Sequence, residues 1–436
     1  MLGHMEKMMK TALLYADQAE IYAERGRAIS LELEKSRIKK TSDATAHGIG
    51  IRVIIKKRLG FAYATDLGKT EELVLRAVTQ AKASRRDSDF RTLPSACKYT
   101  KTKKCYDASV EKLTPETALE YALEMVNAAK EYHRCIMPTA TNLSAGYSEA
   151  FVLNSEGIEV SDKGTFFSAN ISLTADGKVS AEEGQTSRYL KEIDFGWIGR
   201  EAAHVAAESL RAVSIEKKEM PLILTPRALQ SLLSYTTIQQ LSAESVQRGQ
   251  SPYRRGMRLG SEIVNMTDDG TLAGGVCTSK MDGEGVAKQR TLLVRNGMLK
   301  NFLYDSYTAH KEGTKSTGNA ARGYSTPPRI DATNFIIGGT NCKKKELLGG
   351  WGRPQLFATD VIGAHTANRT SGEFSVVIHN GFLVKKGEMK AVKGAMIAGD
   401  MPDMLRKIDL IADDVRKVGG LVSPSVRVSS ISVASG

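Results

Sequence analysis

Hydrophobic residues follow two different periods along the first part of the chain. Between residues 5 and 24 they recur every three or four positions, which is typical of an amphipathic helix. Segments with the alternating or β-branched pattern of strands follow. They occupy residues 29–33, 48–55 and 60–64. Thr70 and the two glutamates after it then predict a second helix, because a hydroxyl cap and early acidic residues stabilise a helix N-terminus.

The same order of elements returns after a basic linker at about residues 85–112. Thr114 and Pro115 predict the start of a helix, because proline is well tolerated in a first turn. Strands are expected at 141–153, 157–175 and 178–190, with a hairpin turn at Asp176-Gly177 and a helix from Asp194 to about Val213. Helix, three strands, helix therefore occurs twice, and we interpret the two units as a structural repeat.

The pattern changes at Glu219, after which short strands and glycine-rich turns prevail. A strand at 220–224 precedes Thr225 and Pro226, which predict a helix to about residue 240. Further predictions are hairpin turns at Asn296-Gly297 and Asn380-Gly381, and a final helix from about Pro402 to Gly419.

Together these patterns predict an α+β fold. Its N-terminal region consists of the duplicated helix–three strands–helix units, and a β-rich C-terminal domain with a few helices follows. The expected domains are residues 1–90, 105–215 and 219–436. A length of 436 residues agrees with more than one domain.

Composition and charge narrow the class of protein. A net charge of +12 allows an acidic partner, but the basic residues are spread out and aromatic residues make up only 6%. Nucleic-acid binding is therefore the weaker interpretation. No apolar run approaches the roughly 18 residues of a membrane helix, and five cysteines without a C-x-x-C pair indicate no disulfide framework. We expect a cytoplasmic protein that does not associate with membranes.

Most common catalytic motifs are absent from the sequence. Gly68-Lys69-Thr70 resembles the end of a phosphate-binding loop, but Tyr63 takes the place of the first glycine. None of the seven histidines forms an H-E-x-x-H or H-E-x-x-x-H motif. His204 lies in an alanine-rich helical segment, and we interpret it as a surface or packing residue rather than a zinc ligand.

Two segments carry more polar side chains than a plain connection requires. In residues 304–322 the candidate contacts are Tyr307, His310, Lys315, Ser316, Thr317, Asn319 and Arg322. In residues 361–375 they are His365 and Asn368, and His365 could also act as an acid or base. The alternative is that both segments are polar turns that satisfy their own backbone groups, and for the second segment this alternative is favoured.

These segments also carry a resemblance to a known family. The run SYTAHKEGTKSTGNAARG, the strand TSGEFS and the closing run IAGDMPDML are similar to the PmbA branch of the TldD/PmbA family, also called TldE or modulator of DNA gyrase. Residues 381–388 match the family's G-x-x-I-x-x-G-E hairpin, with Val384 in the isoleucine position. The resemblance extends to the N-terminal part through its element order, and it implies a peptidase system.

In TldD-type members, H-E-x-x-x-H on the first helix of the C-terminal domain and a later cysteine hold zinc, and the glutamate activates water. Counting from Pro226 places this window on SYTTIQ, with Ser234 and Gln239 at the histidine positions and Tyr235 at the glutamate position. None of the three is a usable zinc ligand or general base. No cysteine follows Cys342. The resemblance therefore implies no cofactor in this chain and zinc in a TldD-like partner.

The resulting hypothesis is a PmbA/TldE-like subunit of a metallopeptidase system that acts on unfolded peptides, as the non-zinc partner of a TldD-like chain in a heterodimer. This chain then contributes no catalytic or metal-binding residue, and a sheet edge is expected to hold the extended peptide. Two alternatives stay open. One is a self-associating, homodimeric peptide-binding protein without catalysis, and the other is a hydrolase whose non-standard metal site includes His310 and His365.

Overall fold

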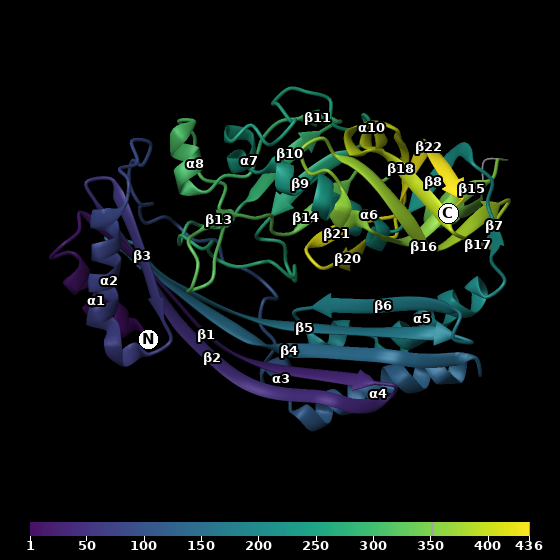
Figure 1. Cartoon of the computed structure of the whole chain (residues 1–436), viewed down its shortest axis with the longest axis horizontal. Helices are drawn as coiled ribbons and strands as arrows, with labels where there is room; N and C mark the ends of the chain where they lie inside the picture. Colours follow the sequence, from purple (N-terminus) through teal and green to yellow (C-terminus); the bar gives the residue numbers. More distant parts are fainter. Residues whose placement is uncertain (350–352, 436) are drawn as a thin grey trace.

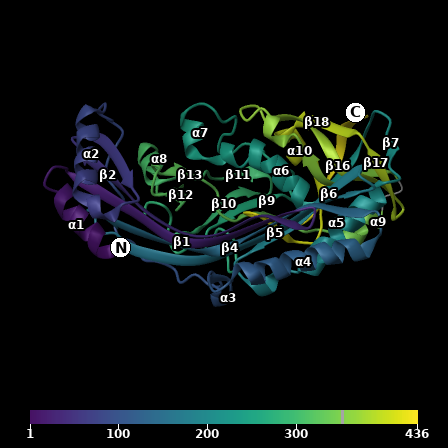
Figure 2. The ribbon, with the colours of Figure 1, turned by 60° about the horizontal axis from the view of Figure 1, so that its bottom comes forward.

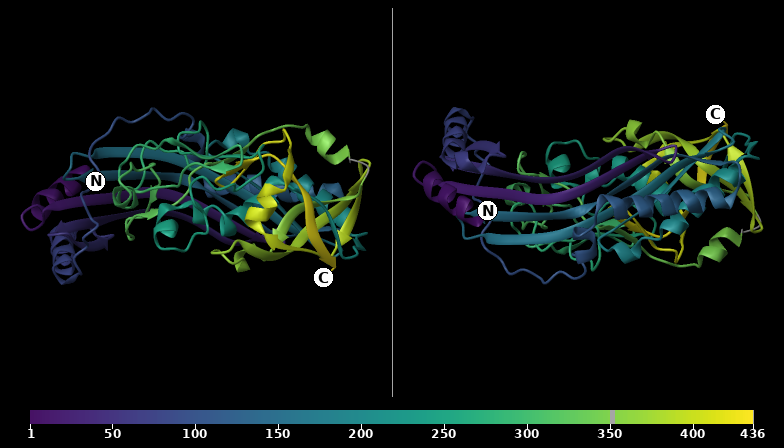
Figure 3. Two further views of the ribbon diagram at one scale, coloured as in Figure 1. Left: turned by 90° about the horizontal axis from the view of Figure 1, so that it is seen from above. Right: turned by 90° about the horizontal axis from the view of Figure 1, so that it is seen from below.

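The computed structural model of the protein describes residues 1–349 and 353–435. A sheet of long strands runs along the molecule, and the second half of the chain lies over one of its faces (Figure 1). We call residues 1–210 the N-terminal region and residues 213–435 the C-terminal region. The two chain termini lie toward opposite ends of the long axis (Figure 3). The mixture of helices and strands confirms the predicted α+β fold.

The N-terminal sheet takes strands from both predicted units, and all neighbours are antiparallel. In spatial order they are β3 (Arg58–Ala64), β2 (Arg37–Ile55), β1 (Gln18–Glu34), β4 (Ile136–Asn154), β5 (Glu159–Ala175) and β6 (Val179–Ser187). The units meet where β1 pairs with β4, so the first strand of each copy lies at the centre. The duplicated order is confirmed, and the two copies share one sheet.

Four helices pack on the N-terminal sheet (Figure 2): α1 (Leu2–Ala12) and α2 (Thr70–Ala83) at one end, and α4 (Pro115–Tyr132) and α5 (Phe195–Ser209) at the other. The short α3 (Ala108–Glu111) precedes α4. The helices share one face of the sheet because apolar residues alternate along β1 and point toward that face. The residues that pack under the helices are Ala19, Ile21, Ala23, Ile29, Leu31 and Leu33. The residues between them, such as Glu20, belong to the other face.

The helix predicted for residues 5–24 is wrong in its second half. α1 ends at Ala12, and Gln18 already begins β1. The spacing of Met5, Met8 and Ala12 does mark a buried helical face. Beyond it the apolar residues alternate, and pairing with both β2 and β4 places them in a strand.

The other predicted helix starts of the first three hundred residues agree with the structure. Side-chain caps are present at Thr114, Asp194 and Thr225. α2 also begins at Thr70, but Thr70 is its first helical residue and Lys69 is its cap.

The described residues of the C-terminal region form two larger sheets. One has the spatial order β11 (Met298–Leu299), β10 (Arg290–Arg295), β9 (Asn265–Asp269), β14 (Phe335–Gly338), β21 (Leu421–Ser423) and β20 (Arg416–Val418). The other has the order β15 (Gln355–Ile362), β8 (Lys218–Leu224), β22 (Val426–Ser435), β18 (Ala395–Asp400), β16 (Glu373–Lys385), β17 (Glu388–Lys393) and β7 (Val213–Ser214), and β19 (Ile408–Ile411) pairs with β22. Because β15 also pairs with β16, this second sheet closes on itself.

Short helices and one small ladder complete the C-terminal region. The helices are α6 (Pro226–Thr236), α7 (Ala243–Gln247), α8 (Ser306–Lys311), α9 (Lys344–Gly349) and α10 (Met401–Arg406), and the ladder consists of β12 (Ala320–Ala321) and β13 (Arg329–Ile330). The core lies between α6 and the two larger sheets and includes Leu229, Leu233, Leu293 and Val376. Among the described residues, no helix is long and apolar enough to cross a membrane.

One of the two hairpin turns predicted in this region is wrong. Asn296-Gly297 connects β10 and β11, with both residues at positive φ. Asn380-Gly381 lies inside β16, and the chain turns only at Lys386-Gly387. Asn380 nevertheless has a φ of 57°. The Asn-Gly pair therefore marks an irregular point of β16, where Asn380 Nδ2 donates a hydrogen bond to Ser180 O of β6 at 2.9 Å.

The final helix predicted from Pro402 to Gly419 is also wrong beyond its first turns. α10 ends at Arg406, and two short strands follow. Ile408 and Ile411, whose spacing fits a helical stripe, belong to β19 and are buried by its pairing with β22. The sequence spacing alone cannot distinguish these cases, because a short helix followed by a short strand produces the same apolar intervals.

Four buried charges join the two regions. Glu20 of β1 and Arg52 of β2 lie on the open face of the N-terminal sheet, and Glu284 and Arg322 reach them from the C-terminal region. Arg52 Nη2 is 3.0 Å from both Glu20 Oε2 and Glu284 Oε1, and Arg322 pairs with Glu20. None of the four side chains is more than 8% exposed. We call these residues the charge cluster.

A loop beside the charge cluster packs closely against β2. The ring of Tyr324 lies over Gly48, where a Cβ would be only 2.4 Å from it. The carbonyl oxygen of Tyr324 lies over Gly50, where a Cβ would be 2.2 Å away. Arg322, two residues earlier, also lies 5.0 Å from the centre of the Tyr22 ring. The two glycines therefore allow this loop to reach the sheet.

A second polar junction lies toward the other end of the molecule. Arg416 pairs with Glu183 of β6 at 3.0 Å, and Arg227 of α6 pairs with Glu182 at 2.9 Å and with Asp360 at 2.7 Å. The C-terminal region is thus attached to the N-terminal sheet by ionic contacts at two separate places.

The charge cluster predicts a large effect of one substitution. Arg52→Met should lower the free energy of unfolding by about 3–5 kcal/mol, because Glu284 then stays buried without its cation. Arg25→Met is the matched control, since Arg25 is half-exposed and pairs with Glu149 at the surface. It should cost no more than about 1 kcal/mol. Denaturant unfolding measures both, and equal losses would contradict the importance of the buried pair.

Candidate functional site

The residues that the sequence count assigns to the zinc-motif positions lie at the end of α6. The helix buries Leu229, Leu232 and Leu233 and leaves Ser234 and Tyr235 half-buried on its outer side. Gln239 follows in a short 3-10 turn and is exposed. The sequence count therefore identified a group of positions at one end of one helix.

The structure brings one of the predicted histidines to this place. The rings of His365 and Tyr235 meet edge to face, with 6.4 Å between their centres. Ser234 Oγ accepts a hydrogen bond from Gln230 Nε2 at 3.2 Å. Asn368, also predicted as a contact, accepts hydrogen bonds from two backbone N–H groups of its own turn. These bonds agree with the alternative interpretation, in which the segment is a polar turn that satisfies its own backbone groups.

The side chains at this place do not fit a zinc ion. Zinc sites use three or four ligands from cysteine, histidine and carboxylate side chains. Here the positions offer a hydroxyl, a phenol and an amide, with the imidazole of His365 beside the phenol. In residues 1–349 and 353–435, no group of three or more histidine, cysteine, aspartate or glutamate side chains could hold a metal ion.

The segment 304–322 is largely tied to the protein itself. Thr317 is 7% exposed, and its hydroxyl accepts a hydrogen bond from Tyr304 N at 2.7 Å. Ser316 Oγ donates to Tyr304 O at 3.2 Å. Asn319 is buried and donates to Asp268 Oδ2 at 2.7 Å, which connects the segment to β9. Thus these side chains close the segment and anchor it.

The remaining residues predicted in this segment fall into two groups. Arg322 belongs to the charge cluster. Lys315 is exposed, whereas Tyr307 and His310 of α8 are half-buried and line a cavity. Their contacts with a peptide or partner stay predictions.

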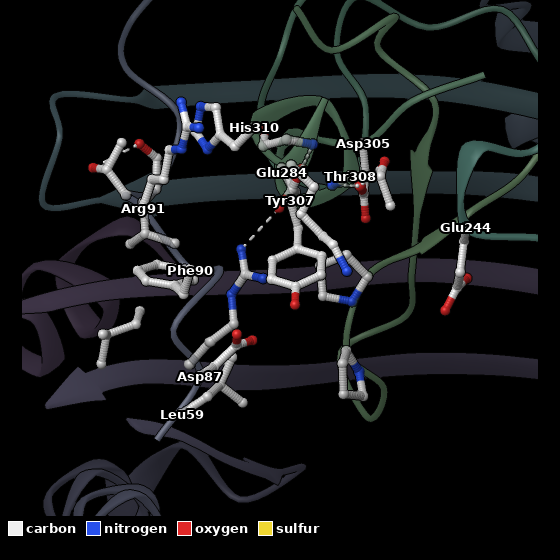
Figure 4. A pocket seen from close by; sticks show the side chains of 18 of the residues that line it. Leu59, Asp87, Phe90, Arg91, Glu244, Glu284, Asp305, Tyr307, Thr308 and His310 are labelled. Carbon is white, nitrogen blue, oxygen red and sulfur yellow. Dashed lines mark hydrogen bonds and ion pairs between the residues drawn. The ribbon is translucent and has the colours of Figure 1, made fainter. Parts of the chain in front are cut away.

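This cavity lies between the N-terminal and C-terminal regions, and we call it the junction cavity (Figure 4). Its volume is about 480 Å³. The N-terminal wall comes from β2, β3 and residues 87–93, and the C-terminal wall from α7, α8 and residues 327–328. Arg52 and Glu284 of the charge cluster also line it. The cavity therefore exists only because the two regions meet here.

Burial changes the acidity of groups in and near this cavity. Burial raises the pKa of Asp305, and the charge of Glu284 adds to the effect. Burial, together with a hydrogen bond to Asp87, raises the pKa of Tyr307 to about 12. Behind the wall, burial and the charge of Glu284 raise the pKa of Asp282 to about 7.

The raised pKa of Asp282 predicts how stability depends on pH. The folded protein binds this proton more tightly than the unfolded chain, so the free energy of unfolding should fall as pH rises from about 4 to 7. Asp282→Asn should flatten this dependence, whereas Asp66→Asn, at an exposed position, should not. Denaturant unfolding at a series of pH values measures the slope. An unchanged slope in Asp282→Asn would count against the raised pKa.

Sequence reasoning missed the charge cluster and the junction cavity. A charged residue inside an apolar strand was the available signal, as with Arg52 in the run IGIRVII and Glu20 in QAEIYAE. Nothing local indicated that Glu284, from the other half of the chain, would meet them.

Comparison with known proteins defines the class of this protein. Models of the PmbA/TldA metallopeptidase family match three ranges: domain 1 at residues 19–84, the central domain at 108–210 and the C-terminal domain at 217–435. The chain belongs to this family, which confirms the resemblance found in its sequence motifs. The exact domain boundaries predicted above remain our proposal.

Individual relatives agree with this assignment over nearly the whole chain. An uncharacterized protein of Methanocaldococcus jannaschii is 33% identical, with 97% of this chain and 98% of the relative covered. A metalloprotease TldD homolog of Haemophilus influenzae is 26% identical, with 91% and 86% covered. The fold is that of TldE from Thermococcus kodakarensis, with a TM-score of 0.93, 24% identity, and 99% and 100% of the two chains covered.

Proposed function

We propose that this chain is a PmbA/TldE-like subunit of a metallopeptidase system that acts on unfolded peptides, and that it is the non-zinc partner of a TldD-like chain. One observation carries the proposal. By the count from Pro226, Ser234 and Gln239 take the places of the two motif histidines and Tyr235 that of the glutamate, at the end of the well-formed α6 and in the 3-10 turn that follows it.

The open face of the N-terminal sheet supports a role in peptide binding. A groove of about 360 Å³ crosses β2, β1, β4 and β5. Its polar lining includes Ser30, Ser42, Asn142, Ser144, Ser168 and Asn170. Asn170 Oδ1 has no hydrogen-bond partner among the described residues. Hydroxyl and amide groups of this kind can bind an extended backbone in the groove, and the edge strands β3 and β6 can accept an added strand.

In this proposal the chain's own residues bind and orient the peptide, and the partner supplies zinc and its water-activating glutamate. The alternative of a self-associating, homodimeric peptide-binding protein without catalysis stays open. The alternative of a non-standard metal site has less support. His365 contacts Tyr235 of α6, whereas His310 lines the junction cavity, and neither belongs to a ligand set within the described residues.

The proposal predicts that the two chains contribute differently to peptide cleavage. This chain alone should not cleave an unstructured peptide, because no zinc-activated water is available to it. Mixed with a TldD-like chain it should support cleavage that a chelator stops and that requires the partner's motif glutamate. Single-turnover assays of each chain and of the mixture measure this. Cleavage by this chain alone that resists chelators and is lost in His365→Ala would overturn the proposal.

A matched pair of lysine variants separates binding from chemistry. Lys315→Ala, in the segment that resembles the family, should weaken complex formation or peptide affinity by about tenfold without slowing the chemical step at saturation. Lys82→Ala, on the exposed side of α2, should change neither. Changes at the buried Thr317, Asn319 or Arg322 are less informative, because they also remove internal hydrogen bonds or ion pairs.

A further inference from the structure

The junction cavity carries opposite charges on different parts of its wall. Glu284 and Asp305 are buried carboxyl groups, and Arg91 and His310 are basic side chains on the same cavity. Figure 4 draws Tyr307 between Arg91 on one side and Asp305 on the other. A volume of about 480 Å³ lies within the range of small-ligand sites. The cavity therefore suits a small ligand with a positive and a negative end.

The acidic part has polar atoms that the chain leaves unsatisfied. Asp305 Oδ1 accepts bonds from Thr308 N at 2.8 Å and from Thr308 Oγ1 at 2.6 Å, while within the described residues Oδ2 accepts none. Ser306 lines the cavity, is 6% exposed, and has a hydroxyl without a hydrogen-bond partner there. Because buried polar atoms are normally bonded, the Ser306 hydroxyl indicates a missing partner, and Asp305 Oδ2 offers an acceptor on the same wall.

A protonated primary amine matches this acidic part. It offers three N–H donors, and its charge is opposite to that of the carboxylates. It would also offset the burial and the repulsion from Glu284 that raise the pKa of Asp305.

The basic part includes donors that no carboxylate of the described residues engages. Arg248, on the same wall, is already paired with Glu244 at 2.7 Å. Neither Arg91 nor His310 has an ion pair or a side-chain hydrogen bond in the part of the chain that the structure describes. An arginine fork beside an imidazole N–H is well suited to bind a carboxylate.

We propose that the junction cavity binds a short peptide by both of its ends, with the amino terminus at Asp305 and Ser306 and the carboxylate at Arg91 and His310. Tyr307, between the two ends, contacts the backbone of the peptide. This inference rests on the proposed function for the source of the ligand, because a peptidase system releases short peptides. The binding is non-covalent and needs no metal.

Calorimetric titration of the intact chain with tri-alanine tests the proposal. Tri-alanine should bind saturably. Its N-acetylated form should bind at least about tenfold more weakly, because the charge that faces Asp305 is lost. Its C-terminal amide should also bind more weakly, because Arg91 and His310 then face no anion. Free alanine and propylamine, which lack the length or the carboxylate, should bind at least about tenfold more weakly than tri-alanine.

Substitutions in the cavity test which side chains bind each end of the peptide. Asp305→Asn keeps the helix cap, since asparagine caps as well as aspartate does, and should weaken tri-alanine binding about tenfold. Asp194→Asn makes the same exchange at the cap of α5, outside the cavity, and should have no effect. Arg91→Gln should abolish the difference between tri-alanine and its amide.

The outcomes separate this inference from the proposed function. If tri-alanine does not bind, or binds equally well after acetylation or in Asp305→Asn, the cavity assignment is wrong even where the mixed complex still cleaves peptides. If propylamine or free alanine binds as tightly as tri-alanine, the ligand is not a peptide and the proposal is overturned. Binding as predicted, in a chain that fails to support cleavage, would instead contradict the proposed function alone.

Discussion

The rest of this structure depends on four charges that are withdrawn from water. Glu20 and Arg52 stand on the open face of one sheet, and Glu284 and Arg322 meet them from the other half of the chain. Buried charges are tolerated only when each is paired, so this cluster permits essentially one arrangement of the two regions. The same contact creates the junction cavity, because Arg52 and Glu284 form part of its wall.

The charge cluster gives residues 304–322, the polar segment that resembles the family, a structural role. Arg322 completes the charge cluster, Asn319 anchors the segment to Asp268 of β9, and Thr317 closes it onto Tyr304. The groups that remain accessible are Tyr307 and His310 of α8, beside the cavity, and the exposed Lys315. Meanwhile α6, at whose end the sequence count places the zinc-motif window, keeps its fold and cap, and no group of side chains within the described residues could hold a metal ion. Both features support our proposal of a chain that binds peptide without metal chemistry of its own.

Local features of the sequence were sufficient to predict much of the fold. The caps at Thr114, Asp194 and Thr225 and the alternating strands are set by nearby residues, and all of them are found in the structure. The errors in helix extent fell at Gln18–Glu24 and Ile408–Ile411, where short apolar intervals fit a helix and a strand equally well and long-range pairing decides. Counting from Pro226 located the end of α6. The contact of Tyr235 with His365 and the entire junction cavity arise from residues distant in sequence, so no local pattern contained them.

The central claim is that this chain contributes structure and binding, and that a TldD-like partner contributes the metal. Native mass spectrometry of the mixed complex, followed by gas-phase separation of its chains, tests this claim most directly. The account predicts that every zinc ion leaves with the TldD-like chain and that this chain is released at its metal-free mass. Zinc retained stoichiometrically by this chain would contradict the account.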